Sequence, residues 1–412
     1  MIEQQAIQME EQSINLKEQA TKLKEQAIPA PARELIPRAH AAALAGIGDL
    51  APSTMVIPNA HYLDPSILQA ELRTTFSAPL LVSPSSAVPN PGDYLTMDLM
   101  GKPIVLIRGA DRRARLFLNI CRHRGAQVVE GSGCSRRLTC SYHGWVYNAE
   151  GSLVGVPGRE GFGDLEVGTL GLVELPTEER HGFVWGMRDP DGVLDLDAHL
   201  GPLDAELAAW GYHYDIAASM ELELSSNWKC ALEAFMETYH FPYVHANSMV
   251  GQFTYADIVT FDQIGRHHRL GVPIHSIGTA PEPAEGEHIV VIYYIYPCTV
   301  IATSMLGGEM LQFYPGADPS TSTIRHTILS RQPISDPDAF YEDYVPLMQA
   351  VIRNEDAPVL ERSGIGLGAG HTDVILGRNE IGCQAAHRQI LADLAGYFEG
   401  ASEKPVALRV GN

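Results

Sequence analysis

The sequence is poor in cysteine and has no long apolar run. Its 412 residues include only 6 cysteines, too few for a disulfide framework, so we expect a reducing compartment. No run of about 18 or more apolar residues is present, which argues against a membrane span. The first residues, MIEQQAIQMEEQ, have neither a basic start nor an apolar segment, so they do not resemble a secretory signal. We therefore expect a cytoplasmic protein that does not enter a membrane.

Basic residues are also scarce relative to acidic ones. The chain has 29 Lys and Arg against 50 Asp and Glu, which gives a formal charge of −21. Such a balance argues against nucleic acid or an anionic membrane surface as a partner, because both repel a negatively charged protein. Hydrophobic residues make up 45% of the sequence, so the chain can bury sizeable cores and is long enough for two or three domains.

The N-terminal segment repeats every seven residues. Residues 1–30 place apolar side chains at a 4–3 spacing until a proline ends the pattern, and we expect a helical extension there. Half of this seam consists of small residues, so a frayed helix and an oligomerising coiled coil both fit. The stretch IPAPARELIP is interpreted as a linker, and residues 31–78 are expected to form a linker and helices that pack on a catalytic domain.

From about Pro79 the sequence alternates short β-rich runs with turn residues, as in PIVLIRG and RLFLNI. This pattern predicts a small antiparallel β domain. After about residue 190 helical segments, including 228–241 and 337–362, are mixed with strand-like runs such as HIVVIYYIY. Helices and strands are therefore segregated by region, which predicts the α+β class.

Two pairs of metal-binding side chains lie within the β-rich region. Cys121 and His123 form a C-x-H pair, and Cys140 and His143 form a C-x-x-H pair sixteen residues later. Two thiolates and two imidazoles could hold a tetrahedral zinc ion. They could equally hold a two-iron cluster with the cysteines on one iron and the histidines on the other. The one-residue gap of C-x-H is shorter than the spacing that zinc ribbons prefer, and it favours the cluster.

The motif C-R-H-R-G…C-x-Y-H-G-W resembles the Rieske domain of the α-subunits of Rieske non-heme iron oxygenases, also called ring-hydroxylating oxygenases. The resemblance implies a [2Fe-2S] domain over residues 79–190 and a catalytic domain over 191–412. It also implies that Cys121 and Cys140 hold one iron and that His123 and His143 hold the other.

A second metal site is indicated by the stretch NWKCALEAFMETYHFPYVH, residues 227–245. Glu237 and His240 are three residues apart, so they should share one face of a helix that Pro242 ends. His245 follows at the exit of the helix and could turn back toward His240. Two histidines and one carboxylate on one face of an Fe(II) ion are the ligand set of non-heme iron oxygenases.

The resemblance supplies roles for these residues and for a third ligand. It implies that His240 and His245 bind the iron, with Asp356 of the sequence RNEDAP as the carboxylate ligand and Glu355 as the competitor. It also implies that Glu237 is a catalytic bridge between a cluster histidine, His143, of one subunit and His240 of the next. A glutamate at this bridge is typical of the branch that resembles choline and carnitine monooxygenases.

The implied activity is that of a terminal mono- or dioxygenase. It would use O2 and electrons from NAD(P)H, delivered by a separate reductase and possibly a ferredoxin, and it would form a homotrimer. The substrate is expected to be a small, largely apolar or aromatic molecule, with the segment 246–330 lining its pocket. A quaternary ammonium monooxygenase or demethylase is the alternative within the family. A Rieske electron-transfer protein without oxygenase activity is the alternative from another class.

Overall fold

The computed structural model describes residues 30–212, 215–278, 288–304, 307–330 and 340–399, so the predicted N-terminal helical extension lies outside the described residues. The chain divides into two compact units. One comprises residues 76–199 with 211–213, and the other comprises residues 1–75, 200–210 and 214–412. Among the described residues, no helix has the length and apolar character that crossing a membrane requires.

The smaller unit consists of three antiparallel sheets. The largest has the strand order β10 (Glu174–Leu175), β5 (Ala114–Leu118), β4 (Pro103–Arg108), β3 (Asp93–Asp98) and β6 (Ser132–Cys134). The second is β7 (Arg137–Thr139), β8 (Val146–Asn148) and β9 (Leu153–Gly155), and the third is β11 (Thr177–Arg180), β12 (Phe183–Gly186) and β2 (Leu80–Pro84).

The core of the smaller unit contains both cysteines of the predicted cluster. Cys121 and Cys140 are buried there together with Phe117, Trp145 and Tyr147. Cys121 lies in the loop after β5 and Cys140 directly after β7, so each cysteine begins a loop at the end of a strand. The strands that the sequence predicted thus lead into two loops, and each loop begins with a buried cysteine.

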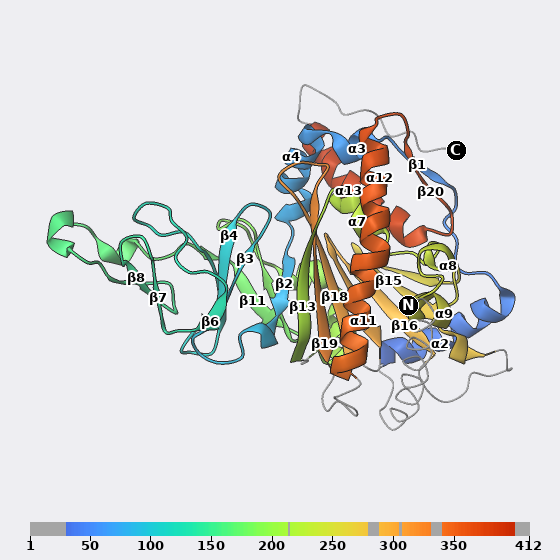
Figure 1. The fold of residues 1–412 in the computed structure, drawn as a ribbon, viewed down its shortest axis with the longest axis horizontal. Coiled ribbons are helices and arrows are strands. Elements are labelled where there is room, and N and C mark those ends of the chain that lie inside the picture. The colour runs from blue at the N-terminus through green and yellow to red at the C-terminus, as the bar shows by residue number, and fades with distance from the viewer. Residues whose placement is uncertain (1–29, 213–214, 279–287, 305–306, 331–339, 400–412) are drawn as a thin grey trace, which may run out of the picture. The chain divides into compact units, whose positions relative to one another are not determined.

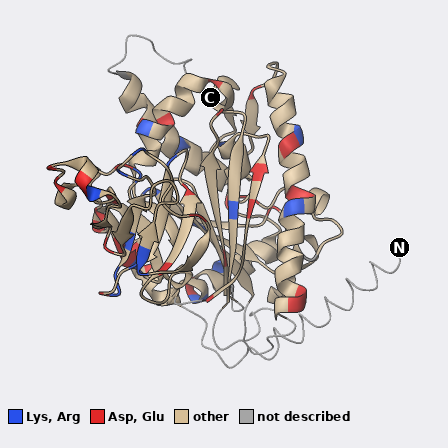
Figure 2. Cartoon of the chain, turned by 60° about the vertical axis from the view of Figure 1, so that its left-hand side comes forward, with Lys and Arg blue, Asp and Glu red and all other residues tan. Residues whose placement is uncertain are grey.

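The larger unit is built on a seven-stranded antiparallel sheet (Figure 1). Its strand order is β13 (Asp215–Leu224), β19 (Ser322–Ser330), β18 (Gly307–Pro315), β17 (Thr299–Ser304), β16 (Ile289–Ile295), β15 (His267–Pro273) and β14 (Thr260–Ile264). Figure 2 shows few charged residues on this sheet, with most of them on helices and loops. The β-branched and aromatic runs of the sequence form these strands because their side chains pack well on a pleated, buried surface.

The larger unit also contains helices, several of which pack against the sheet (Figure 1). They are α2 (Ala30–Ala45), α3 (Ala60–Leu63), α4 (Pro65–Arg73), α6 (Leu203–Trp210), α7 (Trp228–Glu233), α8 (Phe241–Val244), α9 (Met249–Phe253), α11 (Val345–Val351), α12 (Ala357–Gly368) and α13 (Ile381–Glu399). A π-helical turn, Phe340–Tyr344, precedes α11, and a second one, Ile352–Asp356, connects α11 to α12. A short two-stranded pair, β1 (Met55–Ile57) with β20 (Val374–Leu376), completes the unit. The predicted α+β class is confirmed.

Two local expectations are wrong. The stretch interpreted as a linker begins α2 at Ala30, and this helix continues through Pro37 because Leu35 and Ile36 are buried against the sheet. The helix expected over 228–241 ends at Glu233. Pro242 stands in the first turn of α8, where a proline needs no intrahelical hydrogen bond, so it begins a helix instead of ending one.

The Asn-Trp-Lys sequence before the predicted iron site has a structural role. The side chain of Asn227 caps α7 by accepting from the N–H of Lys229 at 2.9 Å. Trp228 Nε1 donates to Glu71 Oε2 at 2.9 Å, and Lys229 Nζ lies 2.5 Å from Glu71 Oε1. Lys229 and Glu71 are both almost completely buried, so removing either would leave an uncompensated buried charge. The three residues therefore anchor α7, and with it the chain that leads to His240.

Candidate metal centres and the adjoining cavity

Three side chains of the larger unit converge on one point. The Nε2 atoms of His240 and His245 lie 3.2 Å apart, and Asp356 Oδ1 lies 3.6 Å from the first and 3.3 Å from the second. A first-row metal bonded at about 2.1 Å to three such atoms would hold them about 3.0–3.5 Å apart. Asp356 and His245 are buried and His240 is 18% exposed. Two imidazoles and one carboxylate on one face fit a mononuclear Fe(II) site.

Short elements bring these side chains together. His240 precedes α8 and His245 follows it, so the single turn of helix returns the chain and places both rings on one side. Gly251 of α9 lies so close to His245 that a Cβ there would be 2.3 Å from the His245 carbonyl oxygen. Asp356 ends the π-helical turn before α12. Such turns occur often at functional sites because they alter the direction of the side chains that follow.

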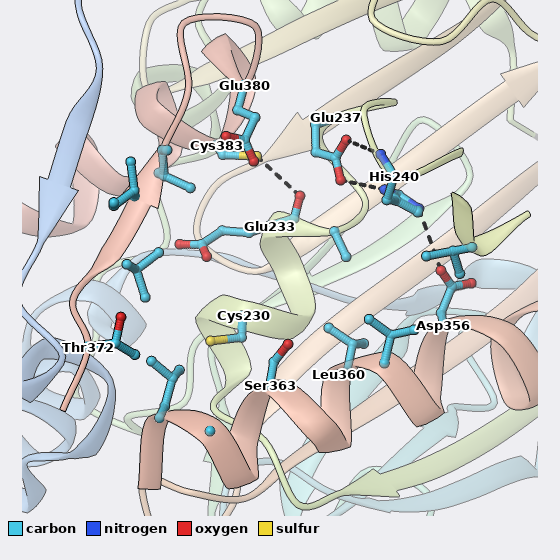
Figure 3. Close-up of a pocket in the computed structure, with 18 of the residues that line it drawn as sticks. Cys230, Glu233, Glu237, His240, Asp356, Leu360, Ser363, Thr372, Glu380 and Cys383 are labelled. Atoms are coloured by element: carbon cyan, nitrogen blue, oxygen red, sulfur yellow. Dashed lines mark hydrogen bonds and ion pairs between the residues drawn. The ribbon is translucent and has the colours of Figure 1, made fainter. Parts of the chain in front are cut away.

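Each histidine of this triad also contacts a carboxylate through its other ring nitrogen. Nδ1 of His240 contacts Glu237 Oε1, and Nδ1 of His245 lies 2.6 Å from Glu355 Oε2 (the first contact is drawn in Figure 3). A carboxylate at Nδ1 fixes the orientation of a ligating histidine and leaves Nε2 for the metal. Sequence reasoning considered Glu355 only as a rival ligand, whereas the structure directs it to the outer side of His245.

The expectation that Glu237 and His240 share a helix face is wrong. Both lie in the loop after α7, where Glu237 Oε2 accepts from the N–H groups of Tyr239 and His240. Glu237 therefore closes a turn of the backbone with one oxygen and contacts the His240 ring with the other. Its side chain is 9% exposed, so the carboxylate is directed to the ring of His240 and not to solvent.

The electrostatics of the triad favour a cation. Burial lowers the pKa of His240, but hydrogen bonds to Asp356 and Glu237 raise it to about 9. Burial raises the pKa of Asp356, yet the two histidines hold it below its usual value. The carboxylates of Asp356 and Glu237 favour the protonated form of His240, and the two imidazoles favour the ionised form of Asp356.

The two loops of the smaller unit have the same backbone hydrogen bonds. The N–H of Cys121 donates to the carbonyl of Ala126, and the N–H of Cys140 donates to that of Trp145. In each loop the glycine four residues after the cysteine donates back to the cysteine carbonyl. These glycines, Gly125 and Gly144, have φ angles of 76° and 68°, a conformation that favours glycine.

The histidines of these loops face one another. The ring centroids of His123 and His143 lie 4.5 Å apart, and the His123 ring stacks on Trp145 at 5.0 Å. Nδ1 of His123 is buried and has no hydrogen-bond partner. A buried ring nitrogen without a partner, beside two buried thiols and a second imidazole, fits a two-iron cluster with sulfur ligands on one iron and nitrogen ligands on the other.

Tyr147 is a residue of this site that sequence reasoning missed. Its hydroxyl lies 3.4 Å from Cys121 Sγ and accepts from the N–H of Arg122 at 2.9 Å. Because the oxygen already accepts from Arg122, its proton is available to the sulfur. Hydrogen bonds to cluster sulfurs raise the reduction potential of iron–sulfur centres. The only signal in the sequence was a tyrosine four residues after His143.

A cavity of about 460 Å³ adjoins the triad (Figure 3). Its walls come from α7 and the following loop, α8, α12, β20 and the start of α13. The lining residues are Cys230, Glu233, Ala234, Glu237, His240, Val244, Asp356, Val359, Leu360, Ser363, Gly366, Leu367, Thr372, Asp373, Val374, Ile375, Leu376, Glu380 and Cys383. None of them belongs to the segment 246–330, so the expectation that this segment lines the pocket does not hold for this cavity.

Comparison with protein families agrees with the two-unit organisation. The Rieske [2Fe-2S] domain matches residues 78–170. The catalytic domain of the ring hydroxylating alpha subunit matches residues 207–396. The first match contains the loops of Cys121 and Cys140, and the second contains His240, His245 and Asp356.

Individual relatives include two kinds of oxygenase. The carnitine monooxygenase oxygenase subunit of Escherichia coli strain K12 is 28% identical over 282 residues, which cover 66% of this chain and 73% of that protein. The large oxygenase component of the naphthalene 1,2-dioxygenase system of Ralstonia sp is 35% identical over 201 residues, or 45% of this chain and 44% of that protein.

Solved structures of both kinds share the fold. The quaternary ammonium Rieske monooxygenase CntA, in complex with an inhibitor, superimposes with a TM-score of 0.73 at 22% identity, over 84% of this chain and 96% of that chain. Naphthalene 1,2-dioxygenase with indole bound superimposes with a TM-score of 0.68 at 19% identity, over 84% of this chain and 95% of that chain.

Proposed function

Because this chain belongs to the Rieske oxygenases as the terminal oxygenase component, with a Rieske [2Fe-2S] domain and a catalytic domain that binds mononuclear iron, we propose the following roles for its residues. Cys121, Cys140, His123 and His143 hold the cluster. His240, His245 and Asp356 hold the mononuclear iron. The observation that carries the proposal is the triangle of 3.2, 3.3 and 3.6 Å between the three ligand atoms of the catalytic domain.

The reaction inserts oxygen into a small organic substrate. In a monooxygenation one atom of O2 enters a substrate C–H bond and the other leaves as water, and in a dioxygenation both atoms enter the substrate as a cis-diol. Either reaction takes up two electrons and two protons. Dealkylation follows when the hydroxylated carbon carries a nitrogen or oxygen. When bound, the cluster would supply electrons one at a time, and an iron held by His240, His245 and Asp356 would supply the chemistry of O2 activation. The protein residues hold the ligands and the substrate: Glu237 and Glu355 orient the two histidines, and Val359 and Leu360 give an apolar wall next to Asp356.

Electrons come from other proteins. Rieske oxygenase α-subunits work with separate reductase or ferredoxin proteins and form multimers. For this chain we propose an NAD(P)H-dependent reductase and a homotrimer in which Glu237 bridges His143 of one subunit to His240 of the next. Support comes from the position of Glu237, whose carboxylate contacts His240, and from the exposure of His143. Arg122 and Arg124, within the loop of Cys121, are exposed and would complement an acidic surface.

A nitrogen-containing substrate is the second candidate, beside an apolar or aromatic one. The E. coli carnitine monooxygenase subunit is similar over two thirds of this chain, and five carboxylates line the cavity next to the triad. An aromatic hydrocarbon would gain nothing from those charges, since burying them against an apolar molecule costs solvation free energy. The apolar residues on the α12 side of the cavity are compatible with either substrate.

Counting iron and following oxygen test the proposal. Reconstituted protein should hold about three irons per chain, two in the cluster and one at the triad. Asp356→Asn should reduce this to about two, leave the paramagnetic resonance signal of the reduced cluster intact, and abolish incorporation of ¹⁸O from ¹⁸O2 into product. Glu361→Gln, an exposed acid on α12, is the matched control and should keep all the iron. An unaltered iron content in Asp356→Asn would refute the triad, and about two irons in the unmutated protein would indicate an electron carrier.

A further inference from the structure

The cavity beside the triad is lined by more carboxylates than cationic groups among the described residues. Of its five carboxylates, Asp356 belongs to the triad and Glu237 contacts His240. Glu233, Glu380 and the exposed Asp373 remain, and the lining contains neither lysine nor arginine. Burial raises the pKa of Glu380 to about 7, and the charges of Glu237 and Glu233 contribute to the increase. A cationic ligand would relieve this repulsion.

The carboxylates of Glu233 and Glu380 are held in place by a few hydrogen bonds and can accept more. Glu233 Oε1 accepts from the Tyr62 hydroxyl at 2.8 Å and lies 3.4 Å from Nδ1 of His387. Glu380 Oε2 accepts from the N–H of Gly377. Each carboxylate has about four lone-pair sites, so these few donors leave acceptor positions open toward the cavity. Figure 3 shows Glu233 and Glu380 on the side of the cavity away from Asp356.

The lining also distinguishes between kinds of cation. A quaternary ammonium group has no N–H to donate, and proteins bind it mainly against the faces of aromatic rings. The described residues that line this cavity include no Phe, Tyr or Trp. Carboxylates with open acceptor positions instead suit an ammonium group that carries hydrogen, because charge-assisted hydrogen bonds are shorter and stronger than neutral ones.

We infer that the substrate of this oxygenase is a protonated amine whose charge lies between Glu233 and Glu380 and whose N–H group donates to one of these two carboxylates. Its apolar part lies against Val359 and Leu360, on the side of the cavity that contains Asp356. The inference rests on the proposed function, since the cavity is taken as the substrate site of the triad. It differs from that function in specifying a primary, secondary or tertiary amine and in excluding a quaternary ammonium compound.

Three ligands of nearly equal shape test the inference. Benzyldimethylamine is protonated at pH 8 and has an N–H, benzyltrimethylammonium is charged without one, and isobutylbenzene is neutral. Titration calorimetry with the full-length, iron-loaded protein should show that the amine binds at least tenfold more tightly than either of the others. Glu233→Gln and Glu380→Gln should each weaken amine binding about tenfold and leave isobutylbenzene binding unchanged. Glu361→Gln should alter neither.

The outcomes separate this inference from the proposed function. Equal or tighter binding of the quaternary ligand would overturn the requirement for an N–H, and equal binding of isobutylbenzene would overturn the requirement for charge. Failure of all three ligands to bind, with Glu380→Gln weakening self-association in sedimentation, would assign the carboxylates to contact with a second copy and also overturn the inference. In each case an intact iron content would leave the proposed function standing. Loss of the triad iron would instead contradict the function itself.

Discussion

Glu355 Oε2 lies 2.6 Å from Nδ1 of His245, while Nε2 of the same ring faces Asp356 Oδ1 at 3.3 Å. Two consecutive residues of one helix thus contact opposite nitrogens of a single imidazole. This arrangement fixes which nitrogen carries hydrogen, because only the protonated Nδ1 can donate to the carboxylate of Glu355. Nε2 is then the nitrogen that gives up its proton to bind a metal, and Glu237 has the same effect on His240.

Removal of the Glu355 carboxylate should weaken metal binding at the triad. We expect Glu355→Ala to lower the affinity for Co(II) about tenfold and Glu355→Gln to lower it less, since the amide oxygen can still accept from Nδ1. Titration of protein that contains the cluster but lacks the mononuclear metal measures this directly. Glu361→Gln, which changes an exposed acid of α12, serves as the control. An unchanged Co(II) affinity in Glu355→Ala would show that packing alone orients His245.

Loss of the Tyr147 hydroxyl should make the cluster harder to reduce. Tyr147→Phe removes the donor to Cys121 Sγ but keeps the buried ring, so the fold should persist. We expect the reduction potential to decrease on the order of tens of millivolts, because the sulfur loses a hydrogen bond that stabilises the reduced state. Protein-film voltammetry gives the value. Tyr94→Phe, in the same unit, should not shift it, and an equal shift in both variants would contradict the prediction.

Glu380 should reduce stability at neutral and alkaline pH. Its pKa is about 7 in the folded protein against 4.5 for an unperturbed glutamate, so ionisation favours the unfolded state. Stability is therefore lost as pH rises from about 4.5 to 7 and does not return above 7. Glu380→Gln should raise the Tm at pH 8 by about 1–2 °C, after allowance for partial solvent exposure, and should have no effect near pH 4.5. Differential scanning calorimetry at both pH values checks this, and an equal gain at both would exclude ionisation as the cause.

A methyl group at position 251 should disturb the triad. The Cβ of Gly251→Ala would lie 2.3 Å from the His245 carbonyl oxygen, a backbone atom that cannot move without moving the ligand. We expect a destabilisation of about 2 kcal/mol and loss of the triad metal, with the cluster unaffected. Gly368→Ala in α12, where nothing lies within 4 Å, is the matched control. Retention of the third iron in Gly251→Ala would show that α9 can move without displacing His245.

Prediction succeeded for the α+β class and the strands, and it failed for the loop before α8. The run HIVVIYYIY became β16 because its β-branched and aromatic residues suit a buried strand wherever it lies in the sheet. The three-residue spacing of Glu237 and His240 fits a helix, yet α7 ends at Glu233, before either residue. Two contacts determine the backbone conformation here. Lys229 is anchored on Glu71, which is far away in the sequence, and the carboxylate of Glu237 closes the turn that follows α7.

The sequence alone determined the candidate iron ligands that are close to one another along the chain. The loops of Cys121 and Cys140 need only a few residues each, so spacing and glycine positions specify their chemistry. Tertiary structure decided the rest. Glu355 lies 110 residues after His245, and only the π-helical turn and the packing of α12 reveal that it faces the outer nitrogen. The acidic cavity likewise joins α7, α12, β20 and α13. The physical reason is that a local motif depends on chain geometry over a few bonds, whereas a cavity depends on how distant elements pack.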